Sequence, residues 1–200
     1  MKQLGLGLVV ALALPFPALA DSSHLSGDYV WTYSDTCLVS PSGFSAPPGL
    51  APGGASALGQ TYSSSGANTG IEHFNSDGTG FVKGGGISVN LGSPPLPAGS
   101  GPPTSFSFQF TYVFNSDDTF TMTTKPNTFF GYASTDSTGP IVATLNGMQW
   151  VGKVSQNAKS HTLTTVTPFV QTVTIIGPPS FVIYQMCRSN VVGFAVNPAD

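Results

Sequence analysis

The sequence predicts an all-β protein: a single antiparallel up-and-down β-barrel of about 8–10 strands. Helix-forming residues are scarce, since Glu and Arg each occur once in 200 residues, whereas Thr, Val, Phe, Ser and Gly are frequent. One long segment alternates strictly between aromatic and polar residues. Asn, Asp and Gly recur between the candidate strands, where they supply the backbone angles that hairpin turns need.

The alternation is clearest in "SFSFQFTYVF" at 105–114. Aromatic residues occupy every second position, and Ser, Gln and Thr occupy most of the positions between them. Because successive side chains of a strand point to opposite faces, this segment is predicted to bury one face. The other candidate strands are 27–39, 69–75, 79–90, 118–125, 141–146, 148–155, 161–175, 180–188 and 191–196. Pro168 is expected to split the run 161–175.

The connections between these strands are of two kinds. Three are tight and carry turn residues: "NSDGT" at 75–79, "NSDDT" at 115–119 and "NG" at 146–147. Three are long and rich in Pro, Gly and Ser: 40–68, 91–104 and 126–140. Loops of this length are either functional or disordered, and composition alone does not separate the two. In a meander, successive connections alternate between the two ends, so all long loops are expected at one end.

The first twenty residues are typical of a secretory signal peptide. Lys2 provides a basic start, an apolar run follows, and Ala18-Leu19-Ala20 matches a cleavage site before Asp21. The apolar run is too short for a membrane helix. We therefore expect residues 21–200 to form one soluble, secreted barrel domain, periplasmic or extracellular, of a size that supports a substantial core.

The chain contains two cysteines, Cys37 and Cys187, near the two ends of the expected mature protein. In an oxidising compartment such a pair predicts one disulfide. Cys37 is expected to end the first strand at the loop end of the barrel. A bond to Cys187 would tie the first strand to the last and help to close the barrel.

The charge balance excludes several classes of partner. Six basic and nine acidic residues give a net charge of -3, which becomes about -4 once Lys2 is removed with the signal peptide. No basic patch is present, so nucleic acid is not an expected partner. No basic amphipathic helix is present, and we expect no membrane span. The oligomeric state is not predicted.

These features resemble those of the calycins, the superfamily that includes bacterial lipocalin-like secreted barrels. The resemblance covers most of 26–196 and rests on the signal peptide, on Trp31 in the first strand "SGDYVWTY", and on "FNSDGTG" and "VSQNAKSHTLTT". Gly27 precedes Trp31 by four residues, whereas lipocalins carry Gly-x-Trp, and the family's later Thr-Asp-Tyr phrase is missing. The resemblance implies binding of small apolar molecules and implies that Arg188 packs over one barrel end.

No catalytic motif or metal site is predicted, and no cofactor is expected. Glu72 and His73 are adjacent and so face opposite sides of a strand. The other histidines, His24 and His161, are far apart in sequence. Most of the loop aspartates, which are Asp77, Asp117, Asp118 and Asp136, lie in hairpin turns, where Asp is expected for backbone reasons. Two segments share a phrase, "FNSDGTG" at 74–80 and "FNSDDTF" at 114–120, and these twin phrases lack the ligand spacing of a calcium loop.

The aromatic faces are the candidate ligand-binding surface. The expected lining residues are Tyr29, Trp31, Tyr33, Phe106, Phe108, Phe110, Tyr112, Phe120, Met122 and Trp150, with Phe114 on the same face. They indicate either a solid core or a cavity for a hydrophobic or aromatic molecule. We favour a ligand-binding protein over an enzyme. The alternatives are a surface or adhesion module acting through its long loops, a barrel isomerase or cyclase, and a transmembrane barrel, whose aromatic girdles are missing.

Overall fold

The computed structural model describes residues 25–41, 43–44, 61–90, 99–100, 104–115, 117, 119–133, 140–165, 170–176 and 180–196. Every regular element in these ranges is a β-strand, and the expected signal peptide lies outside them. No helix in the described part of the chain is long and apolar enough to cross a membrane. The strands are β1 (Gly27–Ser40), β2 (Tyr62–Phe74), β3 (Thr79–Asn90), β4 (Gly99–Ser100), β5 (Thr104–Phe114), β6 (Thr119–Thr124), β7 (Phe129–Tyr132), β8 (Ile141–Asn146), β9 (Gln149–Val154), β10 (Ser160–Thr165), β11 (Val170–Ile175) and β12 (Phe181–Ala195).

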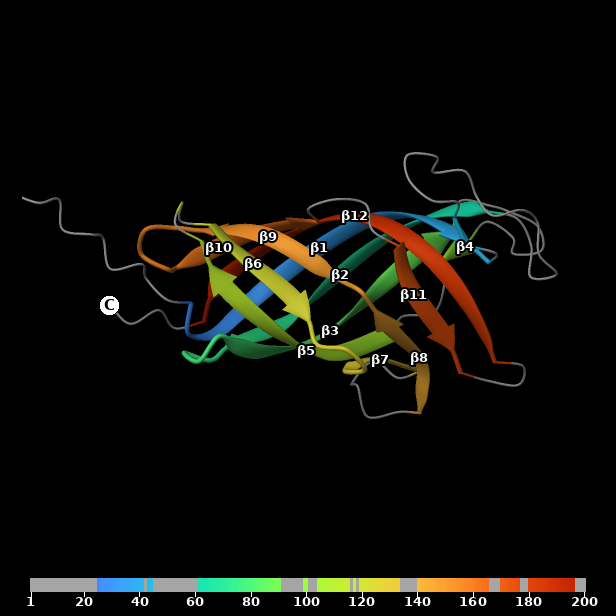
Figure 1. The fold of residues 1–200 in the computed structure, drawn as a ribbon, viewed down its shortest axis with the longest axis horizontal. Coiled ribbons are helices and arrows are strands. Elements are labelled where there is room, and N and C mark those ends of the chain that lie inside the picture. Colours follow the sequence, from blue (N-terminus) through green and yellow to red (C-terminus); the bar gives the residue numbers. More distant parts are fainter. Residues whose placement is uncertain are drawn as a thin grey trace, which may run out of the picture.

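The strands form one antiparallel sheet that closes on itself, which confirms the predicted barrel (Figure 1). Closure occurs where β12 pairs with β1 on one side and with β10 and β11 on the other. β5 pairs with β3 on one side and with β6 and β7 on the other. A closed ring leaves no unpaired edge along its length, which protects the sheet from pairing with other chains.

Three positions of the ring are each occupied by two collinear strands. The left half of the barrel in Figure 1 contains β6, β9 and β10, and the right half contains β7, β8 and β11. β6 pairs with β9, and β9 with β10, while β7 pairs with β8, and β8 with β11. Each of the three positions therefore holds one interrupted strand, made of β6 and β7, of β8 and β9, or of β10 and β11. Counted this way, the barrel has eight positions, with each strand beside its neighbour in sequence.

Three tight turns close one end of the barrel, at the left in Figure 1. The twin phrases form two of them, as predicted. In the first, the Asp77 carboxylate accepts hydrogen bonds from the Thr79 amide at 3.0 Å and from its hydroxyl at 2.6 Å. Asp117 accepts the same pair of bonds from Thr119. The shared sequence is therefore a shared turn chemistry, in which the aspartate satisfies the donors of a residue two positions later.

The prediction that Asn146-Gly147 forms a hairpin turn is wrong. The chain passes from β8 to β9 without reversing, so 141–146 and 148–155 belong to one interrupted strand. Gly147 adopts a φ of 89°, and the side chain of Asn146 accepts a hydrogen bond from the backbone of Asn127 on the neighbouring interrupted strand. An Asn-Gly pair supplies positive φ to such a junction between two collinear strands as readily as to a hairpin. The third tight turn lies instead at 155–159, between β9 and β10.

Several expected boundaries also change. The loop predicted at 40–68 is shorter, because β2 begins at Tyr62, and the loop predicted at 126–140 contains β7. The candidate strands 180–188 and 191–196 are one continuous strand, β12. The predicted split of 161–175 is observed between β10 and β11, although Pro168 itself lies outside the described residues. The long connections still all leave from the end opposite the tight turns, as predicted.

The predicted disulfide is present and joins Cys37 to Cys187. The two residues face each other across the β1–β12 seam, so the bond links the first strand to the last. Neither cysteine ends its strand, since β1 continues to Ser40 and β12 continues to Ala195. The disulfide lies in the half of the barrel nearest the long connections, and it indicates a location outside the reducing cytoplasm.

The half of the barrel nearest the tight turns is filled. Tyr29, Phe74, Phe110 and Phe120 are almost completely buried there. The Phe74 ring meets the rings of Tyr29 and Phe110 edge to face, at centroid distances of 5.4 and 5.1 Å. Such aromatic pairs contribute about 0.5–1.5 kcal/mol each beyond the area they bury. The Tyr29 hydroxyl donates to the carbonyl of Ala158 in a tight turn, which ties the core to this end.

The turn chemistry makes a prediction about pH. Hydrogen bonds from the hydroxyl and the amide of Thr79 lower the pKa of Asp77, and Thr119 does the same for Asp117. Because the folded pKa lies below the unfolded one, these bonds stabilise the barrel above the unfolded pKa and are lost as pH falls through the folded pKa. We expect Thr79→Val to raise the pKa of Asp77 in an NMR titration of the carboxyl carbons.

Each turn is a control for the other. Thr79→Val should leave the pKa of Asp117 unchanged, and Thr119→Val should raise that of Asp117 alone. An unchanged Asp77 titration in Thr79→Val would show that the hydroxyl is not the cause of the lowered pKa.

Candidate functional site

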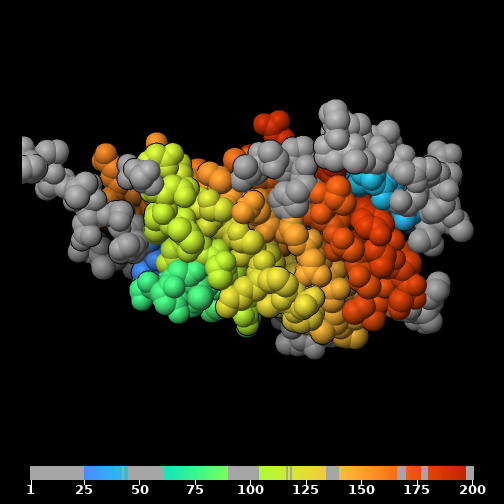
Figure 2. Space-filling view, in the orientation of Figure 1, coloured from blue at the N-terminus to red at the C-terminus, as the bar shows by residue number. Residues whose placement is uncertain are grey.

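A cavity of about 400 Å³ occupies the half of the barrel nearest the long connections. Its inner end is formed by Trp31, Phe108, Met122 and Trp150, which separate it from the packed half. Figure 2 shows that side chains of the strands on the viewed face form a continuous outer wall. The barrel is therefore solid at one end and hollow toward the other, so the core and the cavity expected from the aromatic faces coexist.

One wall of the cavity is a stack of aromatic rings. Phe106, Phe108, Phe129 and Trp150 lie with neighbouring centroids 5.6–6.3 Å apart and ring planes within 17° of one another. They come from β5, β7 and β9, and each side chain lines the cavity. Parallel rings present flat apolar faces, which suit stacking with a flat or apolar ligand.

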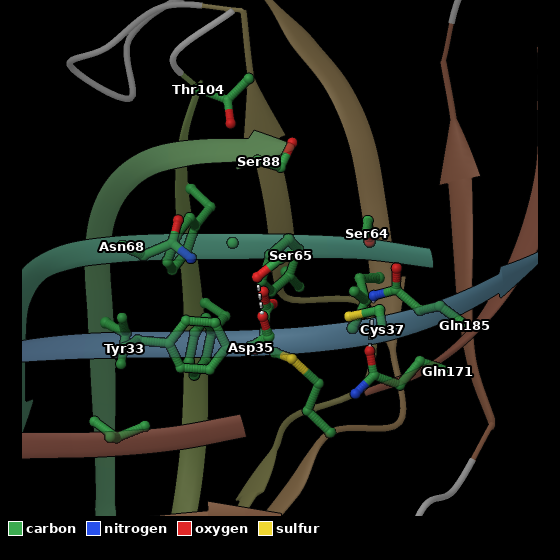
Figure 3. Close-up of a pocket in the computed structure, with 18 of the residues that line it drawn as sticks. Tyr33, Asp35, Cys37, Ser64, Ser65, Asn68, Ser88, Thr104, Gln171 and Gln185 are labelled. Carbon is green, nitrogen blue, oxygen red and sulfur yellow. Dashed lines mark hydrogen bonds between the residues drawn. The ribbon is translucent and has the colours of Figure 1, made fainter. Parts of the chain in front are cut away.

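The opposite wall is polar and centres on Asp35 of β1 (Figure 3). Asp35 occupies one of the odd-numbered, inward-facing positions of β1, between Tyr33 and Cys37. Its carboxylate accepts hydrogen bonds from the Tyr33 hydroxyl and from the backbone amide of Gly66 on β2. A side chain at position 66 would collide with Asp35, because a Cβ there would lie 2.5 Å from its Oδ1. Glycine therefore makes room for the carboxylate.

A chain of hydrogen bonds leads to Asp35 from the aromatic wall. The indole N–H of Trp150, which can only donate, lies 3.1 Å from the Ser189 hydroxyl. That hydroxyl then donates to the Tyr33 oxygen, and the Tyr33 hydroxyl donates to Asp35. Every donor in the chain points the same way, so the chain ends on an oxygen that must accept. The arrangement orients Tyr33 and keeps the Asp35 carboxylate as the acceptor.

Burial changes the titration of both groups. Desolvation raises the pKa of Asp35, and the hydrogen bonds from Tyr33 and Gly66 oppose this only in part. Desolvation also raises the pKa of the Tyr33 hydroxyl, and the nearby Asp35 charge raises it further. Tyr33 is thus a neutral donor at ordinary pH, and Asp35 is a carboxyl group whose charge is poorly solvated.

Other polar residues extend this wall on both sides of Asp35. Ser64 and Asn68 of β2 line the cavity, as do Gln171 of β11 and Gln185 of β12 (Figure 3). The Gln185 amide donates to the Gln171 side-chain oxygen at 2.8 Å. The cavity consequently has one aromatic side and one side with many hydrogen-bonding groups.

The ten residues predicted to bind a ligand fall into two groups. The cavity is lined by Trp31, Tyr33, Phe106, Phe108, Met122 and Trp150. The packed half contains Tyr29, Phe110, Tyr112 and Phe120. All ten face the interior, but the last four pack against one another and do not reach the cavity. Asp35, Asn68 and the two glutamines were not predicted, although their positions on the alternating strands would have placed them inside.

A buried Glu–His pair lies at the inner end of the cavity, which Glu72 borders, and was also missed. Nε2 of His161 on β10 contacts Oε1 of Glu72 on β2, and both side chains are inaccessible to solvent. Glu72 and His73 face opposite sides, as predicted, but Glu72 faces inward and reaches His161 across β1 and β12. Gly193 of β12 lies between them, where any Cβ would overlap His161 and approach Glu72 within 2.6 Å. The sequence did carry a signal for Glu72, because a residue two positions before the inward-facing Phe74 on the same strand must face inward as well.

The described residues do not gather the histidines into a metal site. His73 is on the outer face, where its Nδ1 lies 2.6 Å from Oδ1 of Asp28, whereas His161 is inside. His24, Asp118 and Asp136 lie outside the described ranges. Asp35, Cys37 and Cys187 place potential ligand atoms within 4.8 Å of one another, but both sulfurs are already bonded in the disulfide.

The implied position of Arg188 over a barrel end is wrong. Arg188 is exposed on the outer face of β12, opposite Thr36 of β1. The alternation of β12 explains this, because the neighbouring Cys187 and Ser189 face inward.

The comparisons with known proteins inform the fold alone. No protein-family model and no curated protein sequence matches the chain. One solved structure that is similar is that of Neisserial surface protein A (NspA). It has a TM-score of 0.53 and 11% sequence identity, and the match covers 86% of this chain and 98% of that chain. At this identity the likeness supports a β-barrel and carries no site residue across.

Proposed function

We propose that this barrel binds a small molecule with an aromatic or apolar body in its cavity, as a noncovalent binding protein. The observation that carries the proposal is the cavity itself, whose volume of about 400 Å³ falls within the range of small-molecule sites. Its stacked aromatic wall and its polar wall match the usual composition of such sites, in which apolar surface supplies affinity and a few polar groups fix orientation.

The distribution of side chains supports a barrel that works in water. The interior contains the large aromatic residues, whereas the outer faces of β6, β10 and β11 carry mostly threonines: Thr119, Thr121, Thr123, Thr162, Thr164, Thr172 and Thr174. Membrane-spanning barrels show the reverse pattern, with an apolar outer band and a polar lumen. The exposed apolar residues of the outer face are interspersed with charged ones such as Lys83 and Arg188.

A cavity-blocking substitution tests the proposal. Ser64 and Ser63 are neighbours on β2; Ser64 lines the cavity and Ser63 faces the outside. We expect Ser64→Phe to weaken binding of the neutral fluorescent probe N-phenyl-1-naphthylamine about tenfold or more, because overfilling a closed space costs about 1–3 kcal/mol. Probe fluorescence in a titration gives the affinity.

Ser63→Phe is the matched control, since it adds the same ring to the same strand on the other face. It should bind the probe as the unmodified protein does. Equal weakening by both variants would place the probe outside the cavity and would contradict the proposal.

A second candidate is a surface module that contacts another macromolecule. It is favoured by the arrangement of the connections, because the ends of β1, β3, β7 and β11 that lead into the long loops lie at one end of the barrel. Deleting residues 46–58 should abolish partner binding if this function holds, and should leave the affinity for the naphthyl probe unchanged.

A further inference from the structure

The Asp35 carboxylate is an acidic group inside the barrel that has no basic partner. Among the described residues, the ionisable acids and bases that face the interior are Asp35, Glu72 and His161, apart from tyrosines. Glu72 also borders the inner end of the cavity, but its carboxylate contacts His161 there, and both side chains are inaccessible to solvent. Asp35 lines the cavity and accepts only neutral donors, from Tyr33 and Gly66.

The protein holds no cation that could reach Asp35 from the described strands. Lys83, Lys153 and Arg188 are exposed on the outer face. Lys125 follows β6 at the interruption before β7, where its charge acts on Asp77, and Lys159 lies in the tight turn between β9 and β10. Lys2 and His24 are the only basic residues of the chain outside the described ranges. A half-buried carboxylate without a counterion is poorly stabilised, and a positive charge brought by a ligand would supply what the protein does not.

Desolvation disfavours the Asp35 anion, but the hydrogen bonds at this position are arranged to accept an anion and not a neutral acid. The hydrogen-bond chain from Trp150 through Ser189 and Tyr33 ends on Asp35 and presents only donors to it. The Gly66 amide is a further donor. A protonated carboxyl would need an acceptor for its own hydrogen, and neither the Tyr33 hydroxyl nor the Gly66 amide, which both donate to Asp35, supplies one. The remaining lone pairs of the carboxylate face the cavity.

We propose that the cavity selects ligands that carry an ammonium group on an aromatic or apolar body, with the ammonium paired to Asp35 and the body against the Phe106–Phe108–Trp150 wall. This inference rests on the proposed ligand-binding function and adds the charge of the ligand. Asp35 supplies the counterion, Tyr33 fixes the carboxylate, and the polar side chains of Gln171 and Gln185 lie farther along the same wall.

Three naphthyl probes of equal ring size test the inference: 1-naphthylmethylamine, its neutral analogue 1-naphthalenemethanol, and the anion 1-naphthoate. At neutral pH we expect the amine to bind about ten- to a hundredfold more tightly than the alcohol, since a hydrogen bond to a charged group contributes about 1.5–3 kcal/mol. The carboxylate should bind most weakly. Calorimetric titration gives the three affinities.

Asp35→Asn should abolish the preference for the amine while the alcohol still binds. Asp28→Asn is the matched control, because it removes the same charge from the outer face of the same strand, and it should keep the preference. Asp35→Asn should not lower the melting temperature at neutral pH. The pKa of Asp35 is raised in the folded state, so its ionised form reduces stability once pH rises through that pKa.

The preference for the amine should also fall as pH is lowered through the pKa of Asp35, because protonation removes the carboxylate charge. The amine stays protonated throughout this range, so its own charge does not change. The groups facing Asp35 from β2 are Ser64, Gly66 and Asn68, and the facing residues of β12 are Ser189 and the disulfide-bonded Cys187. None of these titrates in the acid range, and Tyr33, whose pKa is raised, stays neutral.

The outcomes separate the two proposals. Equal affinities for amine and alcohol, or a preference that survives Asp35→Asn, would overturn the role of Asp35 and leave the cavity-binding function standing. Failure of all three probes to bind would overturn both.

Discussion

Removal of the Cys37–Cys187 disulfide is expected to lower the free energy of unfolding by about 5 kcal/mol. The cysteines are 150 residues apart in sequence, so the bond closes nearly the whole barrel into one loop and restricts the unfolded chain strongly. The folded barrel should persist at low temperature, because β1 and β12 remain paired along Tyr29–Ser40. Urea unfolding of Cys37→Ala/Cys187→Ala measures the loss.

Reduced wild-type protein is the control for this variant. It should unfold at nearly the same urea concentration as the double variant, since both lack the cross-link. A loss below about 1 kcal/mol would mean that the β1–β12 seam is held by strand pairing alone.

The second large effect is expected at the buried Glu72–His161 pair, at the inner end of the cavity. His161→Ala should lower the free energy of unfolding by about 3–5 kcal/mol, because it leaves the Glu72 carboxylate, 2% exposed, without its partner. His161 is also enclosed by the rings of Tyr29, Phe74 and Phe120, at 5.2, 5.5 and 6.0 Å, so water cannot easily replace it. Chemical denaturation at neutral pH gives the value.

The chain contains a matched control for this experiment. His73 pairs with Asp28 on the outer face, where the two side chains are 32% and 54% exposed, and such pairs contribute about 0–1 kcal/mol. His73→Ala should therefore have little effect. Glu72→Gln/His161→Ala should recover part of the loss by removing the unpaired charge. Equal effects of His161→Ala and His73→Ala would show that the buried pair does not stabilise the fold.

The barrel and its orientation could be predicted from the sequence because they depend on local chemistry. The alternation of 105–114 defines an inner and an outer face, and "NSDGT" and "NSDDT" define the closed end. The interruptions of the strands could not be predicted in this way. An Asn-Gly pair suits an irregular junction within a strand as well as a hairpin, and only the pairing of β8 with β7 and β11 selects the junction between β8 and β9.

The cavity could be predicted only in part, because it depends on how side chains from different strands fill a common space. The small interior residues Ser64, Gly66 and Ser88 occupy the same half of β2 and β3, and they leave that half hollow. The aromatic residues that fill the other half have the same alternation. Periodicity identifies which residues face inward, whereas the sum of their volumes at each level decides between core and cavity.

The buried pair and the polar wall show the same limit. Glu72, His161 and Gly193 come from three strands that are distant in sequence, and their contact exists only through the register of β2, β1, β12 and β10. Asp35 stands out in the sequence only as an acid at an interior position of β1. That Asp35 has no basic partner follows only from the fold, which places the lysines and the arginine of the described strands on the outer face of the barrel.

Occupancy of the cavity can be measured directly through its tryptophans. The chain has two, Trp31 and Trp150, and both line the cavity. Titration with N-phenyl-1-naphthylamine, excited through tryptophan, should show saturable energy transfer to one probe per barrel, and 1-naphthylmethylamine should compete for it. No energy transfer up to the solubility limit of the probe would contradict a ligand-binding cavity.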